Sequence, residues 1–306
     1  MNQQTTPNST LKVSLIQQQH QGNQVNNLDY IAEQIVSLSK QQCQLIVLQE
    51  LHGSAYFCQT EDLQNFAQAE AIKGPTFEYL SALAKQHQVV IVGSIFEKRA
   101  PGLYHNTAIV IEQDGSLAGH YRKMHIPDDP GYYEKFYFTP GDHQPNTQGF
   151  IPIATSIGKL GVLVCWDQWY PEAARLMTLA GADLLIYPTA IGWDPKDTEN
   201  EKFRQLDAWL TIQRSHAIAN GLPLISCNRV GSEPDPSGQR QGIQFWGNSF
   251  IAGPQGELLA EASRDQATTL SADISLKHSE TVRQAWPFLR DRRIDAYEDL
   301  NKRFLK

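Results

Sequence analysis

The chain has 306 residues, of which 41% are hydrophobic and 19% are charged, and its 26 Lys and Arg against 33 Asp and Glu give a net charge of −7. A chain of this length can bury a large apolar core without disulfides or structural metals. The acidic balance argues against a nucleic-acid-binding protein, because such proteins need a basic face to displace counterions from phosphates.

The N-terminal residues and the cysteines of the chain indicate the cellular compartment in which we expect the protein. Residues 1–10 are polar, so we expect them to be flexible and to contain no secretory signal. No apolar run is long enough to span a bilayer, which predicts no membrane contact. The cysteines lie far apart, with no Cys-x-x-Cys pair, which argues against zinc or a redox motif. We therefore expect a cytoplasmic protein with free thiols and no metal.

Along the chain, short apolar runs alternate with stretches of helical spacing. We predict strands at residues 11–17, 45–49, 89–96, 107–112, 161–165, 184–187, 222–227, 248–252 and 269–273, and helices at 27–40, 76–87, 171–180, 201–220 and 275–284. The run at 45–48 (Leu-Ile-Val-Leu) is apolar at every position, as is typical of strands buried on both faces. The pattern predicts one α/β domain with a mixed sheet over residues 11–306.

The last segment of the chain, from about residue 283, is locally basic and contains Trp-Pro-Phe-Leu at 286–289. We interpret it as a C-terminal extension that is either solvated or packed against another subunit.

The motifs of several enzyme classes are missing from the sequence. It contains no G-x-x-x-x-G-K-[ST], G-x-G-x-x-G, H-E-x-x-H or G-x-S-x-G. These absences remove the simplest grounds for a P-loop or Rossmann nucleotide site, a zinc protease or a serine hydrolase. The remaining candidate chemistry is a cysteine nucleophile that needs no nucleotide.

Three polar residues follow apolar segments, where α/β folds usually place reactive groups. These are Glu50, Lys123 and Cys165, the last shortly before a helix that begins at Pro171. A helix N-terminus and a cation favour a thiolate, a carboxylate can take and return its proton, and an ammonium can stabilise an oxyanion. Glu, Lys and Cys therefore suffice to hydrolyse an amide, a urea or a nitrile without a metal or cofactor.

Taken singly, each of the three has a structural alternative. A cysteine that ends an apolar strand is often a small core residue, a glutamate there is often a cap, and a lysine in a basic tripeptide is often solvated. Spacing alone leaves these alternatives open, because only the fold can bring together residues so far apart in sequence.

The sequence around these residues resembles the signatures of the nitrilase superfamily of carbon–nitrogen hydrolases. The resemblance rests on Leu-Gln-Glu at 48–50, Tyr-Arg-Lys at 121–123, Phe-Thr-Pro-Gly-Asp at 138–142 and Cys-Trp-Asp-Gln-Trp-Tyr-Pro-Glu-Ala-Ala-Arg at 165–175. It extends in order from about residue 11 to about residue 297, and the cysteine motif is its most specific part.

The resemblance implies both a fold and a set of roles. The fold is a four-layer α-β-β-α sandwich of the nitrilase type, usually assembled as dimers that build larger homo-oligomers. Glu50 is implied as general base and acid, Lys123 as oxyanion stabiliser and Cys165 as nucleophile. The backbone N–H of Trp166 is implied as a further oxyanion donor.

A second carboxylate, Glu134, is also implied by the resemblance, either to orient the lysine or to assist the base. Its structural alternative is a loop carboxylate that pairs with Lys135 or Arg122.

Within the superfamily, the stretches at 56–59, 123–127, 165–170, 187–192 and 286–293 resemble amidases that act on a carbamoylated diamine. The implied substrate is a small ureido compound on a four-carbon chain ending in an ammonium, which needs a carboxylate partner because a buried unpaired ammonium is costly. Asp194 is the candidate for that carboxylate, and a turn cap is its alternative. Tyr56, Trp166 and His125 are candidates for lining the site, with core packing or a structural hydrogen bond as alternatives.

Other activities stay open on sequence alone. A hydrolase of carbamoyl amino acids or β-ureidopropionate needs Arg or Lys where Asp194 stands, because its substrate ends in a carboxylate. A nitrilase uses the same three residues and differs only in its pocket. A non-catalytic sensor or scaffold with this fold would have no need of all three.

Overall fold

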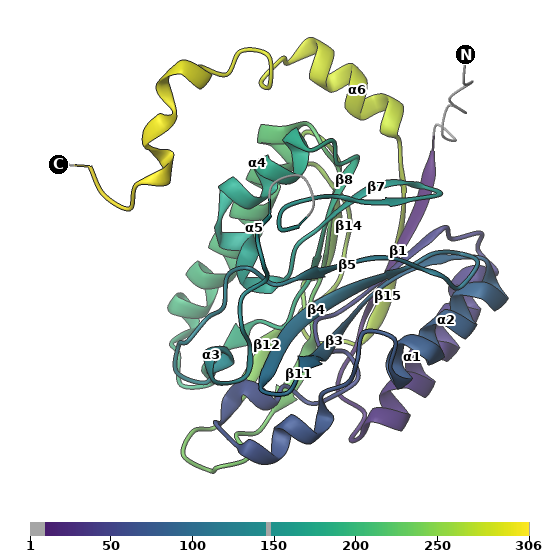
Figure 1. Ribbon diagram of the computed structural model, residues 1–306, viewed down its shortest axis with the longest axis vertical. Coiled ribbons are helices and arrows are strands. Elements are labelled where there is room, and N and C mark those ends of the chain that lie inside the picture. Colours follow the sequence, from purple (N-terminus) through teal and green to yellow (C-terminus); the bar gives the residue numbers. More distant parts are fainter. Residues whose placement is uncertain (1–9, 145–147, 306) are drawn as a thin grey trace.

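The computed structural model describes residues 10–144 and 148–305, so the flexible N-terminus predicted over residues 1–10 lies almost wholly outside the described residues. Two six-stranded sheets pack face to face, and helices cover both outer faces, with α1 and α2 on one side and α4 and α5 on the other (Figure 1). This is the four-layer α-β-β-α sandwich that the resemblance implies. The single mixed sheet expected from the residue pattern is wrong, because the strands form two large sheets that pack face to face.

The sheets combine parallel central strands with antiparallel edges. The first sheet has the order β15 (Thr268–Ile274), β1 (Leu11–Gln17), β2 (Leu45–Leu48), β3 (Val90–Ala100), β4 (Leu103–Ile111) and β5 (Leu117–Arg122). The second has the order β14 (Leu258–Glu261), β13 (Phe250–Ala252), β10 (Leu224–Cys227), β8 (Leu184–Pro188), β7 (Gly158–Val162) and β6 (Ile153–Thr155). A small third sheet joins β11 (Val230–Glu233), β12 (Ile243–Trp246) and β9 (Gly192–Trp193).

The helices lie within three residues of the bounds predicted from the sequence, apart from the short α3, which was not predicted. They are α1 (Gln24–Ser39), α2 (Pro75–His87), the short α3 (Glu134–Tyr137), α4 (Pro171–Leu179), α5 (Glu199–Asn220) and α6 (Leu276–Ala285). Pro171 occupies the first turn of α4, where a missing N–H costs little. The Thr198 hydroxyl accepts the Glu201 N–H at the start of α5, and Gly221 ends that helix with φ +59°.

The core follows from the alternation of apolar side chains along the central strands. In β2, Leu45 and Val47 face the second sheet, whereas Ile46 and Leu48 face α1 and α2. Because both faces are buried, the strand is apolar at every position, as the sequence predicts. The same burial fixes the register of the strand, since a slip by one residue would exchange its two faces.

Several elements differ from the sequence-based expectation. The strand predicted over residues 161–165 is β7, which already ends at Val162, so Cys165 lies beyond the strand in a 3₁₀ turn, Cys165–Trp169. The strands β5, β6, β9, β11, β12 and β14 were not predicted as strands. All six are only two to six residues long, and none has the continuous apolar run that marks an equally short strand such as β2.

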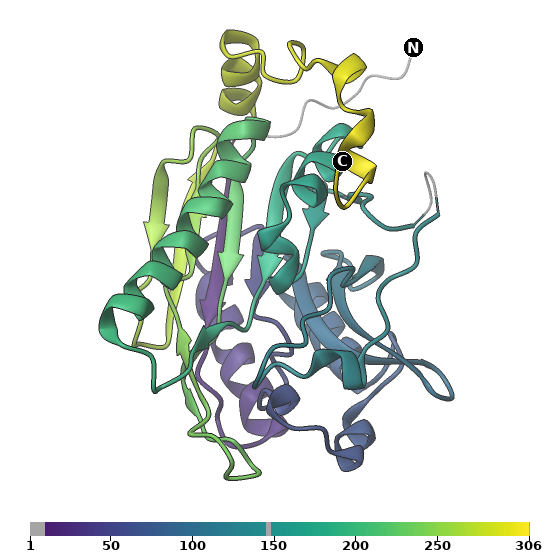
Figure 2. The same ribbon diagram turned by 90° about the vertical axis from the view of Figure 1, so that its left-hand side faces the viewer.

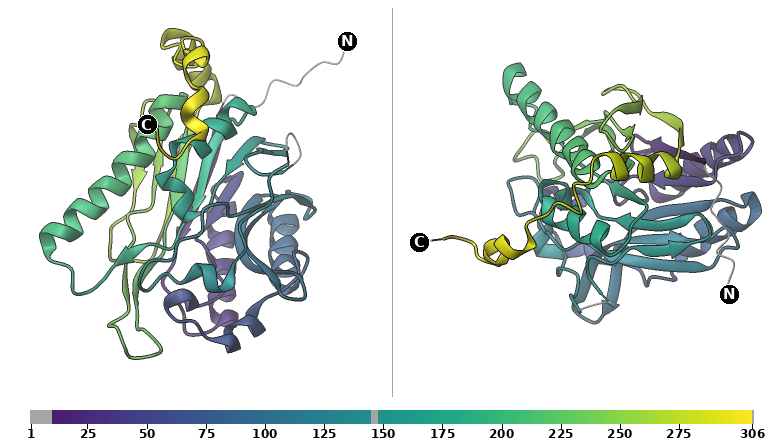
Figure 3. Two further views of the ribbon diagram at one scale, coloured as in Figure 1. Left: turned by 60° about the vertical axis from the view of Figure 1, so that its left-hand side comes forward. Right: turned by 90° about the horizontal axis from the view of Figure 1, so that it is seen from above.

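The segment that follows α6 extends away from the sandwich (Figures 2 and 3). It contains two 3₁₀ turns, Ile294–Ala296 and Glu298–Asn301, and exposes large apolar side chains, including Ile294, Leu300 and Phe304. No helix within the described part of the chain has the length and apolar content to cross a membrane.

Candidate active site

Glu50, Lys123 and Cys165 meet at one end of the two sheets. Glu50 lies two residues after β2, Lys123 directly follows β5, and Cys165 lies three residues after β7. All three are buried, with Cys165 exposed by only 4%. The carboxyl ends of β2 and β7 thus place side chains from opposite sheets in one site, the usual position for reactive groups in α/β folds.

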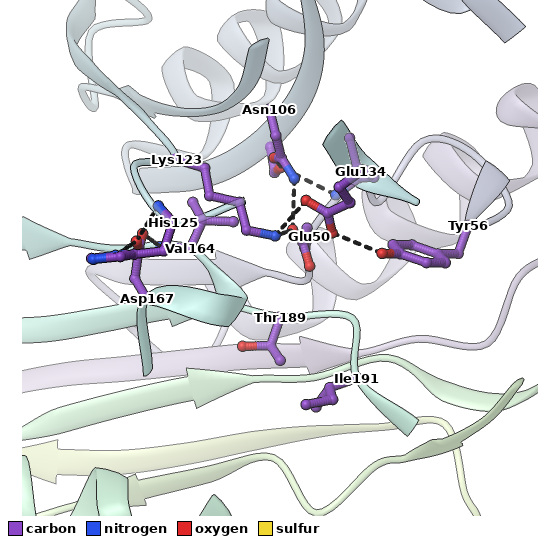
Figure 4. Close-up of polar contacts among 12 residues, drawn as sticks. Glu50, Tyr56, Asn106, Lys123, His125, Glu134, Val164, Asp167, Thr189 and Ile191 are labelled. Carbon is purple, nitrogen blue, oxygen red and sulfur yellow. Dashed lines mark hydrogen bonds and ion pairs between the residues drawn. The ribbon is translucent and has the colours of Figure 1, made fainter. Parts of the chain in front are cut away.

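The Lys123 ammonium lies between two carboxylates (Figure 4). Its Nζ donates to Glu50 Oε1 at 2.9 Å and to Glu134 Oε2 at 2.6 Å. Burial disfavours the charged lysine, but the two carboxylates outweigh it and raise the pKa of Lys123 well above its ordinary value. Lys123 is therefore a permanent cation in this site, suited to stabilise a developing oxyanion.

The two oxygens of Glu50 have different surroundings. Oε1 accepts from Lys123 and from the Asn106 amide, which lies 2.6 Å away. Oε2 is buried and has no hydrogen-bond partner in the described part of the chain. An unsatisfied buried carboxylate oxygen is costly and therefore needs an explanation. The arrangement leaves Oε2 able to accept a proton from a group in the site.

Cys165 has the backbone conformation and charge state of a nucleophile that needs a base. Its φ of +42° lies in the left-handed region, a strained position for a side chain other than glycine. Burial and the nearby Glu50 raise the pKa of the Cys165 thiol well above its ordinary value, so the resting side chain is neutral. Transfer of its proton to Glu50 leaves the net charge of the buried cluster unchanged, which avoids the cost of an additional buried charge.

Glu134 begins the short helix α3 and pairs with neither Lys135 nor Arg122. Its Oε2 binds Lys123, and its Oε1 accepts the Tyr56 hydroxyl at 2.7 Å. Burial, opposed by Lys123 and reinforced by the charge of Glu50, raises the pKa of Glu134 from 4.5 to about 7. Glu134 is thus the second carboxylate expected from the sequence, and it titrates near neutral pH.

A cavity of about 570 Å³ opens onto Cys165 and Glu134. Its lining includes half-buried aromatic side chains, among them Trp166 and Tyr132. It also includes half-buried or exposed charged side chains, which we call its rim: Asp129, Asp194, Asp197, Glu201 and Arg204. Asp194 therefore reaches the cavity, but its Oδ2 already accepts from Arg240 at 2.6 Å and its Oδ1 from the Lys196 N–H at 3.0 Å.

Two of the predicted lining residues, Tyr56 and His125, are not among the residues that line this cavity. Each contacts a carboxylate of the protein instead. Tyr56 is 1% exposed, and its hydroxyl is directed at Glu134 (Figure 4). His125 donates its backbone N–H to Asp167 at 3.1 Å and places Nδ1 2.6 Å from the same carboxylate. Trp166 lines the cavity, as the sequence predicts.

Sequence reasoning missed three residues that support the site: Asn106, Asp167 and Arg229. Asn106 binds Glu50, and Arg229 donates to the backbone carbonyls of Glu50 and Leu51 at 3.2 and 3.0 Å. Asp167 lies inside the cysteine motif, so its position next to the nucleophile could have drawn attention to it. Within the described ranges, no three His, Cys, Asp or Glu side chains gather in a way that could hold a metal ion.

Fold and site together define a thiol amidohydrolase with a Glu–Lys–Cys cluster. The family model for carbon-nitrogen hydrolases matches residues 12–284. A carbon-nitrogen hydrolase from Helicobacter pylori G27 has a crystal structure that superposes with a TM-score of 0.93 at 54% identity, covering 97% of this chain and 100% of that one. The chain belongs to the carbon-nitrogen hydrolase family and hydrolyses amide C–N bonds, as the sequence predicts.

Two named relatives differ in the substrate that their names give. An N-carbamoylputrescine amidase of Arabidopsis thaliana is 45% identical over 84% of this chain and 83% of its own length. A citrullinase of Francisella tularensis subsp. tularensis is 35% identical over 97% of this chain and 100% of its own length.

Proposed function

We propose that this enzyme hydrolyses N-carbamoylputrescine to putrescine, carbon dioxide and ammonia, as a step in polyamine synthesis. The observation that carries the proposal is the cavity that opens onto Cys165 and has a rim rich in carboxylates. Its aromatic and aliphatic lining residues suit a four-carbon chain, and its acidic rim suits the terminal ammonium. The identity to plant N-carbamoylputrescine amidases, 41–45% for the Oryza sativa and Arabidopsis thaliana enzymes, supports the same substrate.

The reaction follows from the charges in the cluster. Glu50 Oε2 takes the thiol proton while Cys165 Sγ attacks the ureido carbon, and Lys123 with the Trp166 N–H stabilises the oxyanion. Ammonia leaves with a proton from Glu50, and a carbamoyl thioester forms on Cys165. Water then gives a proton to Glu50 and attacks the thioester, which releases the thiol and a carbamate. The carbamate separates into putrescine and carbon dioxide.

We consider two of the four rim carboxylates, Asp194 and Asp129, as partners of the substrate ammonium. Asp194, our proposed partner from the sequence, shares its charge with Arg240. Asp129 lies on the same cavity, and no hydrogen bond or ion pair within residues 10–144 and 148–305 engages its carboxylate. We propose that the ammonium binds at Asp194 and that Asp129 adds unshared negative charge. Changing either to Asn should raise KM for the amine substrate and leave kcat nearly unchanged, because neither contacts the reacting carbon.

A second candidate substrate class has its own support in the structure. Citrulline and carbamoyl amino acids end in a carboxylate. Arg204 lines the cavity, and Arg240 is paired with the lining residue Asp194. Arg204 is paired with Glu201, and Arg240 with Asp194, so each cation is already neutralised. The unshared charge at the rim is therefore negative, which favours the amine.

The test compares release of ammonia from N-carbamoylputrescine, citrulline and N-carbamoyl-β-alanine by the wild type and by Cys165→Ala. Fast, Cys165-dependent turnover of the first compound alone supports the proposal. A preference for citrulline or the β-alanine derivative would keep the mechanism and reject the amine-binding rim. A covalent adduct detected by mass spectrometry on a residue other than Cys165 would reject the nucleophile.

We further propose a cytoplasmic homo-oligomer built from one catalytic domain, residues 11–306, in which the extension from about residue 283 packs on a second copy. The family model ends at residue 284, and the segment beyond it exposes Ile294 and Leu300 by 73% and 64%. All four cysteines are free and buried, which suits a reducing compartment. Ile294→Asp with Leu300→Asp should lower the mass measured by light scattering; an unchanged mass would contradict this packing.

A further inference from the structure

Asp167 is a buried carboxylate whose two oxygens are both fully used. It lies two residues after Cys165 in the 3₁₀ turn and is inaccessible to solvent. Oδ2 accepts from the Val164 N–H and from the Tyr121 hydroxyl, each at 2.9 Å. Oδ1 accepts from the His125 N–H at 3.1 Å and lies 2.6 Å from His125 Nδ1. Hydrogen bonds to a charged group are among the stronger ones in a protein interior.

These four contacts join the two segments that contain the nucleophile and the lysine. Val164 directly precedes Cys165, whereas Tyr121 and His125 lie two residues before and two residues after Lys123. Figure 4 shows Asp167 close to both Val164 and His125. One carboxylate therefore bridges the end of the second sheet to the end of the first.

The backbone at Cys165 needs such a restraint. Its φ of +42° is a strained conformation for a residue other than glycine and persists only when the surroundings hold it. Val164, at the start of the turn, has no polar side chain to cap it, and the Asp167 side chain bonds back to the Val164 N–H instead. His125 is itself held in place, because its ring stacks on Tyr170 at 3.7 Å with an interplanar angle of 5°.

We propose that Asp167 is a positioning residue that fixes the Cys165 turn against the Lys123 segment and so sets the geometry in which thiol, base and oxyanion donor act together. The inference rests on the catalytic roles given to Cys165 and Lys123 under the proposed function, but not on which substrate is turned over. Asp167 does not touch the substrate. Its loss acts on the rate of chemistry through the placement of the sulfur.

The test is Asp167→Asn, which keeps the size of the side chain but turns an NH₂ group toward one of these donors. A displacement of the sulfur by about 1 Å should lower kcat about 100-fold, while KM changes less than about threefold. Alkylation of Cys165 by iodoacetamide should slow about tenfold, because transfer of the thiol proton to Glu50 becomes less effective. Iodoacetamide carries its own electrophile, so this readout is independent of the natural substrate and separates failure of the inference from failure of the proposed function.

A matched control is Asp183→Asn, which alters a carboxylate that accepts the backbone N–H of Lys159 away from the site. It should leave kcat and the alkylation rate unchanged. If Asp167→Asn does not fold, Tyr121→Phe removes one donor only and should lower kcat to a smaller extent. The inference is overturned if folded Asp167→Asn, or Tyr121→Phe in its place, retains the kcat and alkylation rate of the control.

Discussion

The hydrogen bond from Tyr56 to Glu134 allows a direct test of what sets the pKa of Glu134. The Tyr56 hydroxyl, 2.7 Å from Glu134 Oε1, favours the ionised carboxylate and so lowers its pKa. A hydrogen bond to a charged group contributes about 1.5–3 kcal/mol, and 1.36 kcal/mol corresponds to about one pKa unit. Tyr56→Phe should therefore raise the pKa of Glu134, about 7 in the wild type, by at least about one unit.

The consequence for activity follows from the role of ionised Glu134 in holding the Lys123 ammonium. At pH 7 the substitution should lower kcat/KM about fivefold or more, with recovery toward pH 9, because fewer molecules carry the ionised carboxylate. The ring keeps its packing against Tyr132 and Phe245, at centroid distances of 5.5 and 6.1 Å, so the fold is retained.

The assay is the pH profile of kcat/KM from pH 5.5 to 9.5 for the wild type and Tyr56→Phe. Tyr137→Phe is the matched control, because its hydroxyl bonds to backbone and amide groups outside the catalytic cluster. The acid limb should move upward only for Tyr56→Phe. An acid limb that stays in place or moves downward would refute the assignment of the limb to Glu134.

Three further predictions concern chemistry and stability. Cys165→Ala should abolish ammonia release and leave the circular dichroism spectrum unchanged, since a small side chain replaces another at the same site. Burial raises the pKa of Glu134 from 4.5 to about 7, so between these pH values the folded chain holds a proton that the unfolded chain has released. The free energy of unfolding therefore falls as the pH rises from about 4.5 to 7. Glu134→Gln should flatten this part of the plot of urea midpoint against pH. Arg229→Ala leaves buried Glu233, 2.6 Å from the guanidinium, without its partner and should cost about 3–5 kcal/mol in denaturant unfolding.

Much of the fold could be predicted from the sequence because its central elements are strongly patterned. The apolar run of β2 and the boundary residues of α4 and α5 gave strand and helix positions close to those observed. The small sheet formed by β9, β11 and β12 could not be predicted, because none of these strands has a continuous apolar run like that of β2. The boundary of β7 was also wrong by three residues, because the apolar residues that follow it are buried without belonging to a strand.

The sequence by itself indicated which groups to expect in the site: a glutamate, a lysine and a cysteine that each follow an apolar segment, with Glu134 added by the resemblance to the nitrilase superfamily. Only the tertiary structure decided how these groups are held. Tyr56 and Glu134 are 78 residues apart, and Asp167 reaches His125 across 42. Hydrogen bonds form only within a few tenths of an ångström of their ideal length, and the spacing of residues along a chain does not report such distances. The identity of the reacting groups is therefore local information, whereas their pKa values and orientations are properties of the folded chain.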